Sequence, residues 1–401
     1  MTQRVDNRPP FLPLAGGEPA ALFEAVPSPA YVIDEAQLHR NGEILKAVAD
    51  RTGAKILLAQ KAFSNFAFYP LLSAYLAGTE ASGLYEARLG REEMGEKEVH
   101  VFCAAYRENE IRELPRYADH IVFNSIAQLK QYGPQLKGKS LGLRINPQCS
   151  TQNGHSIYDP CAPGSRLGVT RESWDAQMDA ETLKMLDGLH FHTLCEQNSD
   201  DLETTLRAVD EKFGDMLPRM QWVNMGGGHH ITRPDYDIGT LCRCIRFAQD
   251  RWQVQVYLEP GEAVALNAGF LVTRVLDLVE NAGTKIAILD SSAACHMPDV
   301  IEMPYTPPLW GASAEESEAL PHRYRLAGPT CLSGDVIGDY SFDHELQIGE
   351  TLLFGDMAIY TTCKNNTFNG MPLPQIWARR ENGTLEVLTR FGYEDFKSRL
   401  G

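Results

Sequence analysis

Lys61 is the residue whose type and position first suggest covalent chemistry. An apolar run, interrupted only by Gln60, leads straight into it. Such a run predicts a strand buried on both faces, as in a parallel barrel, where the chemistry lies at the carboxyl ends of the strands. A desolvated lysine there can lose its proton and attack a carbonyl, which is the chemistry of a Schiff-base lysine that holds pyridoxal phosphate. The alternative is a lysine that only forms an ion pair or extends to solvent at a strand end.

The glycine run Gly226, Gly227 and Gly228 is the second group of interest. Consecutive glycines let backbone N–H groups approach an anion closely. In a barrel, the loops after the seventh and eighth strands are the usual phosphate site, and this run follows the seventh expected strand. His229 and His230 come next, and their simplest interpretation is as polar loop residues.

His190 and His192 are separated by one residue on the sixth expected strand, so the period of two sends both side chains to one face. An H-x-H pair also suggests a metal-dependent hydrolase, with Lys61 and Asp290 available. Barrel hydrolases of that kind carry the motif on the first strand rather than the sixth. A neutral imidazole stacked on a cofactor ring therefore fits His192 better.

Glu259 ends the eighth expected strand, in the sequence Leu-Glu-Pro-Gly. A carboxylate that faces a pyridine nitrogen keeps it protonated, and a pyridinium is the electron sink that carbanion chemistry needs. Alone, Glu259 could equally be an ion-pair partner. A strand-end lysine, a glycine loop and a strand-end glutamate together supply the three contacts that pyridoxal phosphate requires.

A turn in the second half of the chain, residues 328–335, presents a thiol and a carboxylate, Cys331 and Asp335. Cysteines are most often buried and inert, so this turn by itself leaves the role of Cys331 open. Downstream, Tyr360 could complete a phosphate site.

The elements that must position these residues follow a regular alternation of strands and helices. Helical patterns lie between the expected strands, for example at 66–77, 85–94 and 200–212. Eight strand-helix steps in roughly 210 residues match the size of a (β/α)₈ barrel, with a doubly wound sheet as the alternative. The expected strands are 55–60, 79–83, 99–103, 120–124, 141–146, 188–193, 222–225 and 254–259.

The predicted fold is therefore α/β plus β, in three parts. Residues 1–26 form an N-terminal extension, 27–262 the barrel and 263–401 an all-β domain, to which 27–50 contribute in part. The connection 147–168 is too long for an ordinary loop, which suggests a functional one. The β domain is expected to contain strands at 270–280, 285–289, 323–326, 351–354 and 385–389, and an early strand near Tyr31 joins it.

Composition narrows the classes of function. A net charge of −16 over 401 residues argues against nucleic acid or an anionic membrane as partner and suits a cationic substrate. We see no signal peptide and no apolar run long enough to cross a membrane. Nine scattered cysteines suggest free thiols and a reducing compartment, so the expected location is the cytoplasm. The pair Cys242 and Cys244 lies in an expected helix without a second pair, and no metal site is predicted.

With these residues in view, the chain resembles the alanine-racemase-fold family of pyridoxal-phosphate decarboxylases, which includes ornithine, diaminopimelate and arginine decarboxylases. The resemblance runs from about Pro27 to Ile376. Four stretches are characteristic of the branch that acts on carboxynorspermidine and carboxyspermidine: Gln60-Lys-Ala-Phe-Ser64, His192-Thr-Leu-Cys-Glu-Gln197, Asp290-Ser-Ser-Ala-Ala-Cys-His-Met-Pro-Asp299 and Gly328-Pro-Thr-Cys-Leu-Ser-Gly-Asp335.

The resemblance implies a role for each candidate residue. Lys61 forms the imine with pyridoxal phosphate, and His192 stacks on its ring. Cys331 reprotonates the α-carbon and comes from the partner subunit, with Asp335, so the resemblance implies a homodimer with shared active sites. The remaining implied contacts are Glu80, Arg144 and Glu259 around the ring, and Gly226, Gly227, Gly228, Gly261 and Tyr360 around the phosphate. We also expect the substrate to be bound by Glu262, Asp299, Cys331 and Asp335, with Glu262 and Asp299 holding distal ammonium groups of a cationic carboxylated polyamine.

Three departures from the family pattern bear on the substrate. The usual E-P-G-R ends in Glu262 here, so a carboxylate replaces a cationic phosphate contact. The usual H-x-G-S ends in Cys195, and Leu332 stands where ornithine decarboxylase has an acidic residue. The first change suits the polyamine branch, and the other two speak against a small diamino acid.

The predicted function is decarboxylation of carboxynorspermidine or carboxyspermidine to norspermidine or spermidine, in polyamine biosynthesis. One alternative is another decarboxylase of the family, for example one for diaminopimelate. The other is an inactive homologue that only binds a partner protein. Retention of Lys61, Glu259 and Cys331 together favours an enzyme.

Overall fold

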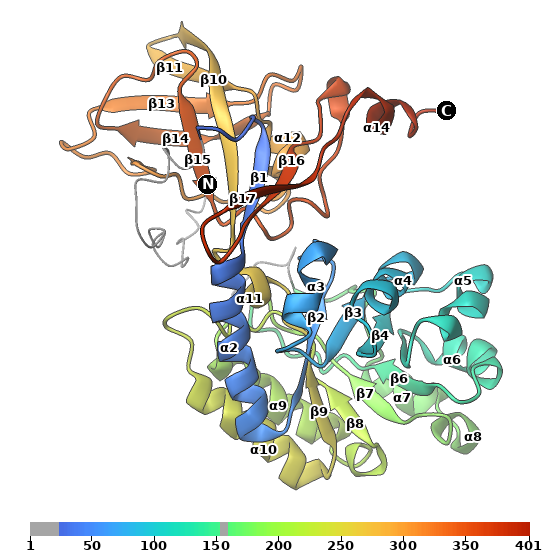
Figure 1. The fold of residues 1–401 in the computed structure, drawn as a ribbon. Coiled ribbons are helices and arrows are strands. Elements are labelled where there is room, and N and C mark those ends of the chain that lie inside the picture. The colour runs from blue at the N-terminus through green and yellow to red at the C-terminus, as the bar shows by residue number, and fades with distance from the viewer. Residues whose placement is uncertain (1–23, 153–158) are drawn as a thin grey trace. The chain divides into compact units, whose positions relative to one another are not determined.

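The computed structural model describes residues 24–152 and 159–401. Nearly all of the predicted extension 1–26, and part of the connection 147–168, lie outside the described residues. The chain divides into two compact units, which we describe one at a time. One unit is the segment His39–Val264, and the other combines residues 24–38 with Ala265–Gly401 (Figure 1).

The first unit is a closed barrel of eight parallel strands in sequence order, as predicted. Closure is direct, since Lys55 on the first strand pairs with Tyr257 on the last. The doubly wound alternative is therefore wrong. The strands are β2 (Lys55–Ala59), β3 (Gly78–Ala81), β4 (Glu98–Phe102), β5 (His120–Phe123), β6 (Ser140–Arg144), β7 (Gly188–His190), β8 (Trp222–Asn224) and β9 (Gln255–Leu258).

Helices surround these strands (Figure 1). Helix α10 shows why, because its buried residues include Leu241, Ile245, Ala248 and Trp252, three or four positions apart on one face. The helices are α2 (Glu35–Thr52), α3 (Tyr69–Leu72), α4 (Leu84–Glu93), α5 (Glu108–Glu113), α6 (Ile126–Tyr132), α7 (Arg171–Gln177), α8 (Ala180–Leu183), α9 (Ser199–Phe213), α10 (Ile238–Trp252) and α11 (Glu262–Ala265), with 3₁₀ turns at Phe66–Phe68, Leu114–Arg116, Gly133–Gln135 and Leu217–Arg219.

The helix predicted over 66–77 is too long. The segment is a 3₁₀ turn followed by α3, which ends at Leu72. Beyond it, the N–H groups of Ala74 and Tyr75 donate to carbonyls only three residues back, so the chain tightens into turns. Among the described helices, none combines the length and apolar character that a membrane crossing requires.

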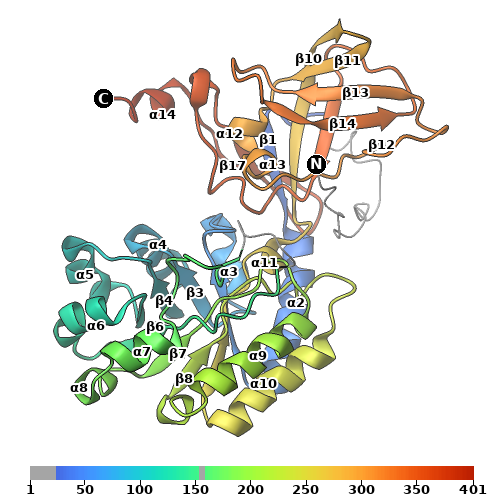
Figure 2. The same ribbon diagram turned by 180° about the vertical axis from the view of Figure 1, so that it is seen from behind.

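The second unit contains a nine-stranded sheet (Figure 2). The early strand β1 joins it between β10, to which it is antiparallel, and β16, to which it is parallel. The strands are β1 (Ala30–Asp34), β10 (Gly269–Asn281), β11 (Thr284–Leu289), β12 (Ala312–Ser313), β13 (His322–Ala327), β14 (Val336–Phe342), β15 (Thr351–Gly355), β16 (Gln375–Arg379) and β17 (Leu385–Thr389). Short helices α12 (Ala293–His296), α13 (Asp299–Glu302) and α14 (Tyr393–Lys397) and a 3₁₀ turn at Phe368–Gly370 complete the unit.

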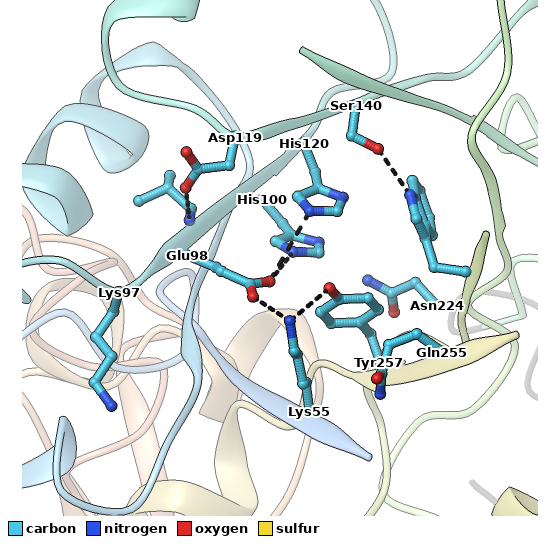
Figure 3. A network of polar contacts seen from close by, with 12 residues as sticks. Lys55, Lys97, Glu98, His100, Asp119, His120, Ser140, Asn224, Gln255 and Tyr257 are labelled. Atoms are coloured by element: carbon cyan, nitrogen blue, oxygen red, sulfur yellow. Dashed lines mark hydrogen bonds and ion pairs between the residues drawn. The ribbon is translucent and has the colours of Figure 1, made fainter. Parts of the chain in front are cut away.

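A polar cluster occupies the amino end of the barrel (Figure 3). Lys55 forms an ion pair with Glu98, and the Glu98 Oε2 lies 3.3 Å from His100 Nε2. The rings of His100 and His120 stack with centroids 3.9 Å apart. Burial raises the pKa of Glu98, but His100 and Lys55 outweigh it and lower the pKa to about 2. Burial, with His100 beside it, lowers the pKa of His120 to about 3.

Candidate active site

Lys61 lies in a turn just beyond β2, at the carboxyl end of the barrel. The strands on either side hold this turn, because the Ala59 N–H donates to Pro260 O (3.2 Å) and the Gln60 N–H to Glu80 O (3.0 Å). The Gln60 side chain accepts from Tyr69 Oη at 3.0 Å. The Lys61 backbone is thus fixed between the ends of β3 and β9.

Two buried carboxyl groups, Glu80 on β3 and Glu259 after β9, interact with the charge of Lys61, which by itself lowers the pKa of each. Glu259 accepts from His190 Nε2 at 3.1 Å and from Asn224 Nδ2. Among the described residues, Glu80 Oε2 has no hydrogen-bond partner. Burial and the charge of Glu259 raise the pKa of Glu80 well above its usual range. Burial also raises the pKa of Glu259, but His190 and Lys61 outweigh it, so the pKa falls.

Arg144 ends β6 and is buried. Its Nη2 donates to the carbonyl of His192 at 3.0 Å, and its guanidinium lies 4.7 Å from the centroid of the Phe102 ring. Burial lowers the pKa of Arg144 to about 10, although Glu259 and Glu80 oppose that shift. The site therefore keeps a buried cation that acts on both carboxyl groups.

The strand predicted to carry both histidines is shorter than expected. We expected a strand over 188–193, but β7 ends at His190. The last contact of this segment with β8 is the hydrogen bond from the Phe191 N–H to Asn224 O, at 2.9 Å. The segment then turns away from β8, and the Gln197 N–H donates to Gly228 O in the glycine loop. This detour brings the segment 192–197 against the glycine loop.

His192 nevertheless faces the same site as His190. Their ring nitrogens and a Glu259 oxygen all lie within 4.8 Å of one another, so the three residues could also hold a metal ion. The positive charges of Lys61 and Arg144, which act on both rings, oppose a cation there. The Gly227 N–H donates to His192 Nδ1 at 3.2 Å, and burial, then Lys61, lowers the pKa of His192 well below its usual range. The ring is therefore neutral.

The three glycines are required by close packing. A Cβ at Gly226 would lie 2.5 Å from Phe191 O, one at Gly227 2.5 Å from Glu259 O, and one at Gly228 2.2 Å from Leu194 O. Gly226 and Gly228 also adopt positive φ angles of 70° and 79°. Within the described residues, the N–H groups of Gly228 and His229 donate to no acceptor. A small anion could therefore bind there.

Gly261 and Glu262 follow Glu259. A Cβ at Gly261 would lie 2.6 Å from Ala62 Cβ, so glycine lets this turn approach the Lys61 turn. Glu262 begins α11, and its Oε2 lies 3.1 Å from Nε2 of the buried His230. Burial lowers the pKa of His230, but Glu262 outweighs it and the pKa rises. The sequence indicated only a polar loop residue at His230, because its partner is 32 positions away.

The remaining candidates lie in the sheet unit. Cys331 is exposed on the loop between β13 and β14, whereas Asp335, at the end of the same loop, is buried. Tyr360 is partly buried and has a positive φ of 49°. Asp299 begins α13 and forms an ion pair with Lys364. The structure thus brings Cys331 and Asp335 into one loop.

Comparisons with known proteins give one consistent family. The model of the family described as pyridoxal-dependent decarboxylase, C-terminal sheet domain, matches residues 30–358. A carboxynorspermidine/carboxyspermidine decarboxylase of Campylobacter jejuni is 42% identical over 94% of this chain and all of its own length. A carboxyaminopropylagmatine decarboxylase of Synechocystis is 41% identical over 94% of this chain and 97% of its own length. The crystal structure of the Campylobacter jejuni carboxynorspermidine decarboxylase complexed with norspermidine superposes with a TM-score of 0.86, at 40% identity, over 93% of this chain and all of that one.

The cofactor of this family, pyridoxal 5′-phosphate, fits the residues at the carboxyl end of the barrel. A lysine there can bond an aldehyde, and the two open N–H groups of the glycine loop can bind a phosphate. The anionic Glu259 suits a ring nitrogen, and Glu80 Oε2 lacks a partner among the described residues. The chain belongs to the family of pyridoxal-dependent decarboxylases.

Proposed function

We propose that the protein decarboxylates carboxynorspermidine or carboxyspermidine to the corresponding triamine, norspermidine or spermidine. The observation that carries the choice of substrate is the 42% identity to the Campylobacter jejuni enzyme over that enzyme's whole length. The Synechocystis relative, at 41%, makes carboxyaminopropylagmatine a second candidate. Both names describe a long cationic substrate with one carboxylate, which suits the acidic chain.

The barrel residues have distinct roles in this proposal. Lys61 would hold the cofactor through its amine, at the position that the amine of the substrate would also use. When bound, the cofactor's pyridinium ring takes up the electron pair that departing carbon dioxide leaves behind. Glu259, held anionic by His190 and Asn224, keeps the ring nitrogen protonated.

Other residues orient the cofactor. The neutral His192 would pack on the ring, and Glu80 and Arg144 would frame it. Gly226, Gly227 and Gly228 would hold the phosphate, with Gly261 leaving room for the turn and Tyr360 adding a hydroxyl. The support for this placement is the packing that makes the glycines necessary and the two open N–H groups beside them.

The proton that replaces the carboxylate comes from Cys331. Its exposed position on a surface loop suits delivery to the site of a second copy of the chain, so we propose a homodimer with shared active sites. Glu262 and Asp299 hold the distal ammonium groups of the substrate. All nine cysteines are free, which supports the cytoplasm as the place of action.

An assay of the purified protein with pyridoxal phosphate tests the proposal. The substrates are carboxynorspermidine, carboxyspermidine, carboxyaminopropylagmatine and diaminopimelate, and the measurement is kcat/KM for each. We expect the first two to exceed diaminopimelate by about two orders of magnitude, because two missing charge contacts cost about 3 kcal/mol or more. A higher value for carboxyaminopropylagmatine would select the second candidate, and a preference for diaminopimelate would refute both.

A further inference from the structure

The loop that carries Cys331, residues 328–335, is closed by the main chain of Asp335. The Gly328 N–H donates to Asp335 O at 2.9 Å, and the Asp335 N–H donates to Leu332 O at 2.9 Å. Asp335 is only 2% exposed, while Cys331 lies at the surface. The closed end of the loop, at Asp335, is therefore buried, whereas the thiol of Cys331 is exposed.

The side chain of Asp335 holds the same loop from inside. The single hydroxyl hydrogen of Ser292 lies between the two carboxylate oxygens, which are 3.0 and 2.9 Å from Oγ, and Thr330 Oγ1 donates at 2.7 Å. The N–H of Ala294 adds a contact of 3.3 Å. A Cβ at Gly328 would lie 2.2 Å from Asp335 Oδ2, so only glycine allows this approach. The carboxylate thus links the loop to the start of α12.

Cys331 is fixed from the other side by Asn369. The Cys331 N–H donates to Asn369 Oδ1 at 2.7 Å. Asn369 has a φ of 59°, in the left-handed region that asparagine tolerates better than most residues. Thr330, the neighbour of Cys331, is the residue that Asp335 holds. The backbone around the thiol is therefore held at Cys331 by Asn369 and at Thr330 by Asp335.

We propose that Asp335 is a positioning residue that acts through Cys331 and does not contact the substrate. A carboxylate offers about four lone pairs, and four donors already occupy them: the hydroxyls of Ser292 and Thr330 and the N–H groups of Ala294 and Thr330. The inference rests on the proposed function, in which the Cys331 S–H donates its proton to the carbon that has lost carbon dioxide. The thiolate then recovers a proton from water. A displaced thiol leaves that carbon to be protonated by water from either face.

Product stereochemistry in D₂O distinguishes positioning from general damage. The wild-type enzyme should place one deuterium, in one configuration, on the carbon that carried the carboxylate. Asp335→Ala should lower kcat at least about tenfold, leave KM within about twofold, and give a mixture of configurations, as Cys331→Ala should. Asp335→Asn should lie between the wild type and Asp335→Ala in kcat and in the purity of the product configuration, because its oxygen still accepts from Ser292 and its amide can donate to Thr330 Oγ1.

Asp339→Asn is the matched control, because Asp339 lies on β14 in an exposed ion pair with Arg325. It should match the wild type in all three measurements. If Asp335→Ala does not fold, Asp335→Asn and Ser292→Ala carry the same test. Wild-type kcat and stereochemistry in the Asp335 variants, or a rise in KM at unchanged kcat, would overturn the positioning role. A Cys331→Ala variant with normal kcat and stereochemistry would instead show that the proposed proton donor itself is wrong.

Discussion

Glu80 and Glu259 stand at the ends of the two strands that flank β2, and their pKa values move in opposite directions. Burial acts on both carboxyl groups in the same sense. The difference is that Glu259 accepts hydrogen bonds from His190 and Asn224, whereas Glu80 is influenced by the charge of Glu259 itself. Protonation of the pair is therefore asymmetric, because Glu80 holds a proton more strongly than Glu259 does.

This asymmetry predicts different costs for two identical substitutions. Glu259→Gln removes the anion proposed to face the ring nitrogen, so kcat should fall by about two orders of magnitude or more. Glu80→Gln replaces a carboxyl group whose anion is disfavoured by burial and by Glu259 with a neutral amide of the same shape, and kcat should fall less than about tenfold. Steady-state kinetics of both variants at pH 7 are the measurement. Equal losses would contradict the assigned charges.

Lys61→Ala should abolish the absorbance band of the imine between the lysine and the cofactor, because the covalent attachment is lost. Lys55→Ala is the matched control. Lys55 begins the same strand, at the amino end of the barrel, where it pairs with Glu98. That variant should keep the band, although its stability should fall. An unchanged spectrum for Lys61→Ala would refute the assignment of the attachment site.

The barrel was predictable from the sequence because most of its strands are short, mainly apolar runs bounded by polar residues, with β3 (Gly-Thr-Glu-Ala) as an exception. The partners of the active-site residues were not. Asn224 and His190 reach Glu259 across 35 and 69 positions, and no local pattern reports such a contact. The strands β12, β14 and β16 were also missed. In β14 the cause is local, since Gly338 and Asp339 have low strand propensity and the pairing with β13 decides the conformation.

Glu262→Gln should raise KM for carboxynorspermidine about tenfold or more. A charge-assisted contact to an ammonium group is worth about 1.5 to 3 kcal/mol when partly buried. The amide keeps the shape of the side chain and can still accept from His230. Glu211→Gln, on the exposed face of α9, serves as the control and should leave KM unchanged. Wild-type kinetics for Glu262→Gln would remove this residue from substrate recognition.

The low pKa of His120 predicts a loss of stability in acid. The unfolded state takes up a proton near pH 6.5, whereas the folded state does so only near pH 3, so stability falls as the pH drops through that window. At pH 5 the cost is about 2 kcal/mol.

Urea unfolding of His120→Gln at pH 7 and pH 5 measures this cost. The variant should lose less stability between the two values than the wild type does. His344→Gln is the control. His344 is exposed and its pKa is raised by hydrogen bonds to Asp343 and Glu350, so it stays protonated in both states below its ordinary pKa. Because a raised pKa makes His344 add stability as the pH falls from 7 to 5, its replacement should leave the loss no smaller than in the wild type. An equally steep loss for His120→Gln and the wild type would contradict the role of His120.

A mixing experiment tests whether the active site is shared between subunits. If Lys61 of one chain works with Cys331 of the other, a dimer of Lys61→Ala and Cys331→Ala chains carries both lesions in one site and none in the other. Each variant alone should be nearly inactive. Refolding the two together with random reassociation makes about half of the dimers mixed, and half of their sites are intact, so activity should approach roughly a quarter of the wild-type value. If Cys331 served the Lys61 of its own chain, every site in every mixture would carry one lesion, and mixing would restore nothing above the activity of the separate variants.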